Sequence, residues 1–118
     1  MYSLWRGALK GGMPLLQVDE SFNGKQIDLP AGETLEVSLS ENKTTGFQWI
    51  FEKSTKELLS LVKEEVEPGE KIGEPGIHRW LFRTEHAGSV RIQLFYRRPW
   101  EEKEKPQRTF ILTVRSSK

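Results

Sequence analysis

The chain has 118 residues, of which 18 are basic and 17 acidic, and its formal net charge is +1. A chain of this length is expected to fold as one domain and to bury roughly 65% of its unfolded surface. The balanced charge excludes the basic footprint of a nucleic-acid-binding protein. The lack of cysteine excludes disulfides, thiolate metal sites and a cysteine nucleophile.

Residues 1–14 place Gly7, Gly11, Gly12 and Pro14 among scattered apolar residues, with neither helical nor strand periodicity. We therefore expect a poorly ordered N-terminal arm, followed by a folded domain over residues 15–118. The arm lacks the continuous apolar segment of a signal peptide, so none is predicted within it, and the compartment stays open. No apolar run in the chain approaches about 18 residues, so no membrane span is expected.

The first part of the domain alternates apolar and polar residues, which predicts short strands. We expect strands over residues 16–19, 26–29 and 34–40, with Leu35, Val37 and Leu39 of the third facing the core. Asn23-Gly24 is typical of a two-residue hairpin turn between the first two strands.

A polar stretch, Asn42-Lys43-Thr44-Thr45-Gly46, then leads directly into an aromatic strand over residues 47–52. Short polar residues and glycine favour loop geometry. In the strand, alternation directs Phe47 and Trp49 toward the core. A polar tip held on a rigid scaffold is a common design for a binding loop, although an ordinary turn between strands fits this stretch equally well.

The middle of the chain is less regular. Ser54 and Glu57 form a possible helix N-cap pair, and a strand is expected through Leu61 and Val62. Residues 64–71 are charged and contain Pro68-Gly69, so we predict a solvated loop, with a charged recognition patch as the functional alternative.

The last third alternates again and predicts strands over residues 77–84, 90–96 and 110–114. Between the last two strands lies the segment Arg97-Arg98-Pro99-Trp100, followed by a solvated charge run over residues 101–105. Seven to eight short strands with almost no helix indicate an all-β, antiparallel, Ig-like β-sandwich without a disulfide. Counting strand reversals puts the Asn42, Gly73 and Arg98 segments at one end of this sandwich.

The candidate catalytic groups are weak. His78 and His86 lie eight residues apart on one predicted strand, roughly 26 Å at strand rise, so they are expected to be two partly exposed histidines rather than a site. No serine or threonine has a recognisable base, and the pairs Glu64-Glu65 and Glu101-Glu102 lie in charged segments. We therefore predict that the protein is not an enzyme and uses no metal or cofactor.

Three motifs in order resemble the chagasin family, the Ig-like protein inhibitors of papain-like cysteine peptidases. The family's Asn-Pro-Thr-Thr-Gly-aromatic loop corresponds to residues 42–47, with Lys43 where proline is usual. Its Gly-rich loop is represented only by Gly73 and Gly76, and its Arg-Pro-Trp loop is intact at residues 98–100. The resemblance covers roughly residue 16 to the end.

The resemblance implies a tight, reversible inhibitor that occludes the active-site cleft of a papain-like, cathepsin L-like or similar cysteine peptidase, and that is a monomer when free. It assigns the contact with the peptidase to Asn42, Lys43, Thr44, Thr45, Gly46, Phe47, Gly73, Glu74, Pro75, Gly76, Arg98, Pro99 and Trp100.

Trp100 falls outside the strand alternation, so its ring is either packed under a loop or exposed for binding. The rival function is an Ig-like adhesion or carbohydrate-binding module that uses this tryptophan. Asn42-Lys43-Thr44 is also a formal glycosylation sequon, which the inhibitor function requires to be unused.

Overall fold

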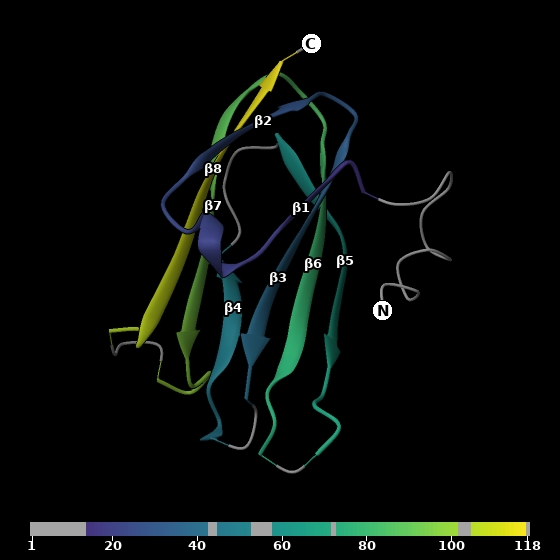
Figure 1. The fold of residues 1–118 in the computed structure, drawn as a ribbon. Coiled ribbons are helices and arrows are strands. Elements are labelled where there is room, and N and C mark those ends of the chain that lie inside the picture. The colour runs from purple at the N-terminus through teal and green to yellow at the C-terminus, as the bar shows by residue number, and fades with distance from the viewer. Residues whose placement is uncertain (1–13, 43–44, 53–57, 72, 102–104, 118) are drawn as a thin grey trace.

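The computed structural model describes residues 14–42, 45–52, 58–71, 73–101 and 105–117, which form two four-stranded β-sheets around one core (Figure 1). The sheets have the strand orders β1-β3-β6-β5 and β2-β8-β7-β4. The predicted Ig-like β-sandwich is confirmed. In chain order the strands are β1 (Leu16–Val18), β2 (Gln26–Pro30), β3 (Thr34–Glu41), β4 (Gln48–Glu52), β5 (Leu59–Glu67), β6 (Gly76–Thr84), β7 (Gly88–Arg97) and β8 (Arg108–Ser117).

Alternating side chains of both sheets build the core, as the sequence pattern predicts. Leu35, Val37 and Leu39 of β3 are buried, and Trp80 and Phe82 of β6 are fully buried opposite them in the sheet register. The facing sheet contributes a second set of buried side chains, which includes Trp49, Ile92, Leu94, Phe110 and Leu112.

Two edge pairs of the sandwich are parallel, because β1 pairs with β3 and β2 pairs with β8. The predicted hairpin at Asn23-Gly24 is therefore wrong, since β1 and β2 belong to different sheets. A short 3-10 helix, Glu20–Phe22, carries the chain across instead. The Asn-Gly pair then docks on β8, where Asn23 Oδ1 accepts a hydrogen bond from the Ile111 N–H at 2.8 Å and the Gly24 N–H donates to the Ile111 carbonyl at 2.7 Å.

The predicted solvated loop over residues 64–71 is wrong in its first half, because β5 continues to Glu67. Its charged residues are accommodated because β5 is an edge strand and Arg79 of β6 balances them. Arg79 Nη1 lies 2.7 Å from Glu67 Oε1 and 3.6 Å from Glu65 Oε2.

Some expectations fall outside the described residues. These are the helix cap at Ser54 and Glu57, and the whole N-terminal arm except Pro14. Within the described ranges, no helix has the length and apolarity needed to cross a membrane.

The strand register brings three connections to one end of the sandwich, the end opposite the C-terminus in Figure 1. Glu41, the last residue of β3, pairs with Gly76, the first residue of β6. Gln48, the first residue of β4, pairs with Arg97, the last residue of β7. The segment between β3 and β4 therefore lies between the β5–β6 connection on one side and the β7–β8 connection on the other.

Candidate functional site

The three connections at this end are the Asn42 loop (residues 42–47), the Gly73 loop (residues 68–75) and the Arg98 loop (residues 98–107); together they form the loop edge. Every described residue of the candidate site lies on these loops or, for Gly76, at the first position of β6. Lys43 and Thr44 lie outside the described residues.

The Asn42 loop is fixed at both of its roots. The Glu41 carboxylate, at the end of β3, accepts a 2.7 Å hydrogen bond from the backbone N–H of Trp49 in β4. The Trp49 indole N–H donates in turn to the Ser40 carbonyl at 3.0 Å. These bonds join the two sheets across the base of the loop, because β3 and β4 belong to different sheets.

The tip of the Asn42 loop is held by one hydroxyl. Thr45 Oγ1 donates to the Asn42 carbonyl at 3.1 Å and accepts from the Phe47 N–H at 3.3 Å. Gly46, between them, has φ +83°, a left-handed conformation that glycine adopts at little cost. The Phe47 ring stacks on Tyr96 at 5.5 Å between centroids, so the loop leaves its turn onto the aromatic core.

The Arg98 loop presents the most exposed large apolar side chain of the described residues, Trp100, at 70% exposure. The Arg97 guanidinium donates to the carbonyls of Arg98 and Pro99, each at 3.4 Å, and the Glu101 N–H donates to the Arg98 carbonyl at 3.0 Å. The tryptophan therefore projects from a turn that its own backbone and a neighbouring arginine stabilise.

The Asn42 and Arg98 loops contact each other. A Cβ added at Gly46 would lie 3.3 Å from Cη2 of Trp100, and the Arg98 guanidinium lies 4.6 Å from the centre of the Phe47 ring. This contact makes one continuous surface from two loops that belong to different sequence motifs.

The Gly73 loop is organised by Glu74, whose carboxylate accepts hydrogen bonds from the N–H groups of Glu70 at 2.7 Å and Lys71 at 3.3 Å. Gly76 is required by close backbone approach, since a Cβ there would collide with the Glu67 carbonyl oxygen. The pairing of Gly76 with Glu41 sets this loop beside the Asn42 loop.

Directly behind the loop edge lies a buried polar cluster that the sequence analysis missed. His78, expected to be partly exposed, is only 4% exposed. Its Nδ1 lies 2.9 Å from Glu41 Oε1 and its Nε2 lies 2.7 Å from Glu64 Oε2. Alternation with Trp80 and Phe82 is the sequence signal from which an inward-facing His78 could have been predicted. His86 lies beyond the end of β6 and is exposed.

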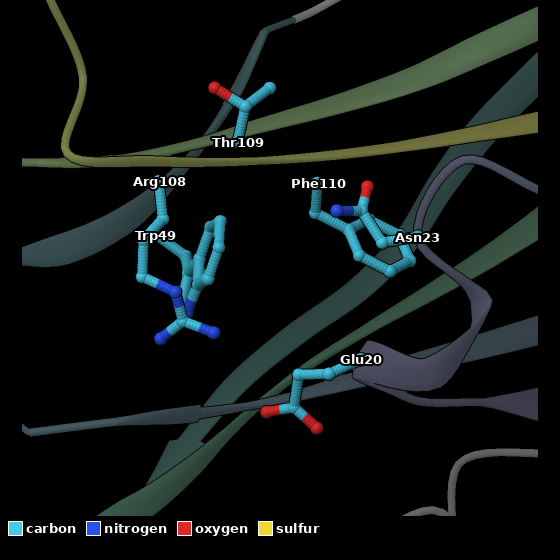
Figure 2. A pocket seen from close by; sticks show the side chains of 6 residues that line it. All are labelled: Glu20, Asn23, Trp49, Arg108, Thr109 and Phe110. Carbon is cyan, nitrogen blue, oxygen red and sulfur yellow. The ribbon is translucent and has the colours of Figure 1, made fainter.

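A hollow of about 240 Å³ lies on the flank of the sandwich beside Trp49, lined by Glu20, Asn23, Trp49, Arg108, Thr109 and Phe110 (Figure 2). The Arg108 guanidinium lies 5.2 Å from the centre of the Trp49 ring, and the Glu20 carboxylate comes from the 3-10 helix on another wall. Burial by itself would raise the pKa of Glu20, but hydrogen bonds from the Ser40 N–H and hydroxyl outweigh it and lower this pKa below its ordinary value. Two residues that line the hollow thus stabilise the root of the Asn42 loop: Trp49 is part of this root, and Glu20 binds Ser40.

No grouping of histidine and carboxylate side chains suited to a metal ion occurs among the described residues. The described part of the loop edge places Thr45 and Gly46 beside the exposed ring of Trp100, an arrangement suited to contact with another macromolecule.

The sequence matches known proteins over most of its length. The model of the chagasin family peptidase inhibitors, I42, matches residues 28–114. Chagasin from Trypanosoma cruzi is 32% identical over 90 residues, which cover 71% of this chain and 82% of that protein. Amoebiasin-1 from Entamoeba histolytica is 30% identical over 101 residues, which cover 84% of this chain and 97% of that protein.

Solved structures share the fold. The cysteine protease inhibitor EhICP2 from Entamoeba histolytica superposes with a TM-score of 0.77 at 23% identity, covering 89% of this chain and all of that one. The solution structure of amebosin gives a TM-score of 0.71 at 30% identity, covering 89% of this chain and 100% of that one. PbICP-C, solved in complex with falcipain-2, gives a TM-score of 0.64 at 19% identity, covering 86% of this chain and 98% of that one.

Proposed function

This chain belongs to the chagasin family of peptidase inhibitors, and we propose that it inhibits papain-like cysteine peptidases by inserting the loop edge into their active-site cleft. As a member of this family it is a cysteine peptidase inhibitor and not an enzyme, in agreement with the sequence analysis. The observation that carries the proposed mechanism is the contact between Gly46 and the Trp100 ring, because it joins the tip of one loop to the exposed anchor of another.

The Asn42 loop is the part proposed to enter the cleft beside the catalytic cysteine. Its tip residues are small, and its backbone can supply hydrogen bonds to the cleft. Thr45 fixes the turn, and Glu41 and Trp49 fix the roots. A loop that is ordered before binding loses little conformational entropy on binding, and a stiff loop in a non-productive geometry resists cleavage.

The two flanking loops are proposed to grip the walls of the cleft. Trp100 is exposed and stands on a turn restrained by Pro99, which suits an interface hot spot. The Gly73 loop lies on the other side of the Asn42 loop. Three separated loops can supply an interface of standard size, on the order of 1,600 Å² in total.

The target proposed is a papain-like peptidase of the cathepsin L type or similar, bound by a monomeric inhibitor. Lys43 stands where the family usually has proline, so the tip carries one additional positive charge. That charge favours clefts with acidic walls.

The experiment is a titration of papain with the protein and with two tryptophan variants, Trp100→Ala and Trp49→Ala. Trp100→Ala removes an exposed anchor, so the inhibition constant should rise about thirtyfold or more, corresponding to roughly 2 kcal/mol of binding free energy. Its unfolding free energy should change by only about 0.5 kcal/mol.

Trp49→Ala is the matched control, because Trp49 is a core residue at 3% exposure. It should lose about 3–5 kcal/mol of stability. Absence of papain inhibition by the unmodified protein would favour the adhesion or carbohydrate-binding alternative. A well-folded Trp100→Ala protein with unchanged inhibition would remove Trp100 from the interface.

A further inference from the structure

His78 sits between two carboxylates that belong to different strands of the same sheet. Glu41 is the last residue of β3 and its side chain is fully buried, whereas the side chain of Glu64 in β5 is 44% exposed. The imidazole stacks on the Trp80 indole with ring centroids 3.8 Å apart and planes inclined by 13°. Both ring nitrogens are thus used, and the ring has an aromatic support.

The geometry of this cluster accommodates a proton on each ring nitrogen. A neutral imidazole has one N–H donor and one lone pair, and an ionised carboxylate only accepts. Both N···O distances, 2.9 Å to Glu41 and 2.7 Å to Glu64, are hydrogen-bond distances, so a ring with a proton on both nitrogens can donate to both carboxylates. In that state the cluster has a net charge of −1, compared with −2 for a neutral ring between two carboxylates. The stacked indole further favours a cationic ring.

The cluster connects two loops of the loop edge. Through Glu41, which also accepts the Trp49 N–H, the ring acts on the roots of the Asn42 loop. Through Glu64 it holds the edge strand β5, whose end at Glu67 leads into the Gly73 loop. His78 itself lies only two positions beyond Gly76, where that loop ends.

We propose that His78 is a positioning residue which, when its ring carries a proton on both nitrogens, clamps the Asn42 and Gly73 loops together and so strengthens inhibition at acidic pH. The proposal rests on the inhibitory function argued above. When the second proton is lost, the remaining one stays with Glu41, because that carboxylate has no access to water, and the half-exposed Glu64 is released to solvent. The β5 end of the Gly73 loop then loses its side-chain link to His78 and Glu41, and is held by its backbone pairing with β6 and by Arg79.

Among the described residues of the packed strands, the His78 ring contacts Glu41 of β3, Glu64 of β5 and Trp80 of β6 itself. From the facing sheet, Trp49 donates its backbone N–H to Glu41, and its neighbour Arg108 carries a fixed charge. Glu20, bound to Ser40, is the next carboxylate along this side, and it stays ionised because its pKa is lowered.

The free protein gives the first test. The two ring nitrogens of His78, observed by ¹⁵N NMR, should both be protonated at pH 5, and one should lose its proton as the pH is raised toward 8. A ring with a single proton at pH 5 would overturn the proposal. This measurement needs no peptidase, so it remains decisive for the proton count even where the protein fails to inhibit papain, an outcome that would overturn the proposed function instead.

The second test compares inhibition of papain at pH 5 and pH 8 by the wild-type protein, Glu64→Gln and Glu65→Gln. An amide at position 64 can donate to or accept from Nε2, so it suits either state of the ring and should abolish the dependence. For each protein, the inhibition constant at pH 8 is divided by the inhibition constant at pH 5. This ratio should be about five times larger for the wild-type protein than for Glu64→Gln, a factor that corresponds to part of the free energy of one charge-assisted hydrogen bond. Taking this quotient cancels the pH dependence of the peptidase itself.

Glu65→Gln is the control, because Glu65 is the adjacent carboxylate on β5 and contacts Arg79 instead of His78. It should keep the wild-type pH dependence. Equal ratios for the wild-type protein and Glu64→Gln would show that the clamp does not reach the loops, and the same loss of pH dependence in Glu65→Gln would assign the effect to the general charge of β5.

Discussion

Two residues at the tip of the Asn42 loop determine how it meets the rest of the loop edge. Thr45 closes the turn by bonding to backbone groups on both sides of it. Gly46 allows the chain to turn in a left-handed conformation and leaves room for the ring of Trp100. The absence of a side chain at Gly46 is therefore as important for the shape of this surface as the exposed ring of Trp100.

Gly46→Ala tests this contact. The new Cβ would lie 3.3 Å from the Trp100 ring and would displace it, and the left-handed backbone would be strained. We expect a stability loss of about 1 kcal/mol, together with an inhibition constant for papain at least about tenfold higher.

Gly32→Ala separates the two effects, because Gly32 has a similar φ of +89°, stands in the turn between β2 and β3, and has open space around its Cβ position. It should cost a similar amount of stability and leave inhibition unchanged. Wild-type inhibition by a folded Gly46→Ala protein would contradict the contact.

At the residue scale, alternation predicted the buried Trp49, and the break in alternation left two possibilities for Trp100, of which the exposed one is observed. It did not predict the partners of His78. Alternation reveals which face a side chain is on, whereas Glu41 is 37 residues away and reaches the ring only through the register of β3 and β6.

At the scale of elements, edge strands account for the differences between prediction and structure. β5 has three glutamates and a lysine within nine residues, a composition typical of a loop. It is nevertheless a strand because His78 and Arg79 of β6 balance its carboxylates. β1 and β2 are short, and their parallel pairing depends on which distant strand has a free edge, so local alternation carries no information about it.

The 3-10 helix Glu20–Phe22 provides a test at this scale. Glu20 accepts hydrogen bonds from the Ser40 N–H at 2.7 Å and the Ser40 hydroxyl at 2.9 Å, which tie the helix to β3 near the root of the Asn42 loop. Because the pKa of Glu20 is lowered in the folded protein, its stabilising effect is fully present above about pH 4.5 and is lost as the pH falls through the lowered value.

Glu20→Gln should therefore reduce the unfolding free energy by about 1 kcal/mol near pH 7, a value discounted for partial exposure. The difference from the wild-type protein should shrink below pH 4. Denaturant titrations at pH 7 and pH 3 measure both values. Asp28→Asn is the control, since Asp28 is exposed and lies 3.7 Å from exposed Arg115, and it should change stability by less than about 0.5 kcal/mol. A Glu20→Gln difference that grows in acid would contradict the account.

At the scale of the whole molecule, the proposed mechanism of inhibition depends on the sandwich bringing separate motifs to one end. The order of strands and the count of reversals predicted this arrangement, and the pairing of Glu41 with Gly76 and of Gln48 with Arg97 gives its register. The contact between the Asn42 and Arg98 loops could not be predicted, because it depends on side-chain positions at the meeting point of two sheets.

We propose that the loop edge as a whole occupies the active-site cleft of a papain-like peptidase. The most direct measurement is the dissociation constant of the protein for papain in two forms, one unmodified and one whose cleft is filled by a bulky covalent inhibitor on the catalytic cysteine. Papain capped with only a small methylthio group is the control for loss of the free thiol. Occlusion of the cleft predicts tight binding to the unmodified enzyme and at least about a hundredfold weaker binding to the filled enzyme. Equal affinity for the unmodified and the filled enzymes would contradict occlusion of the cleft.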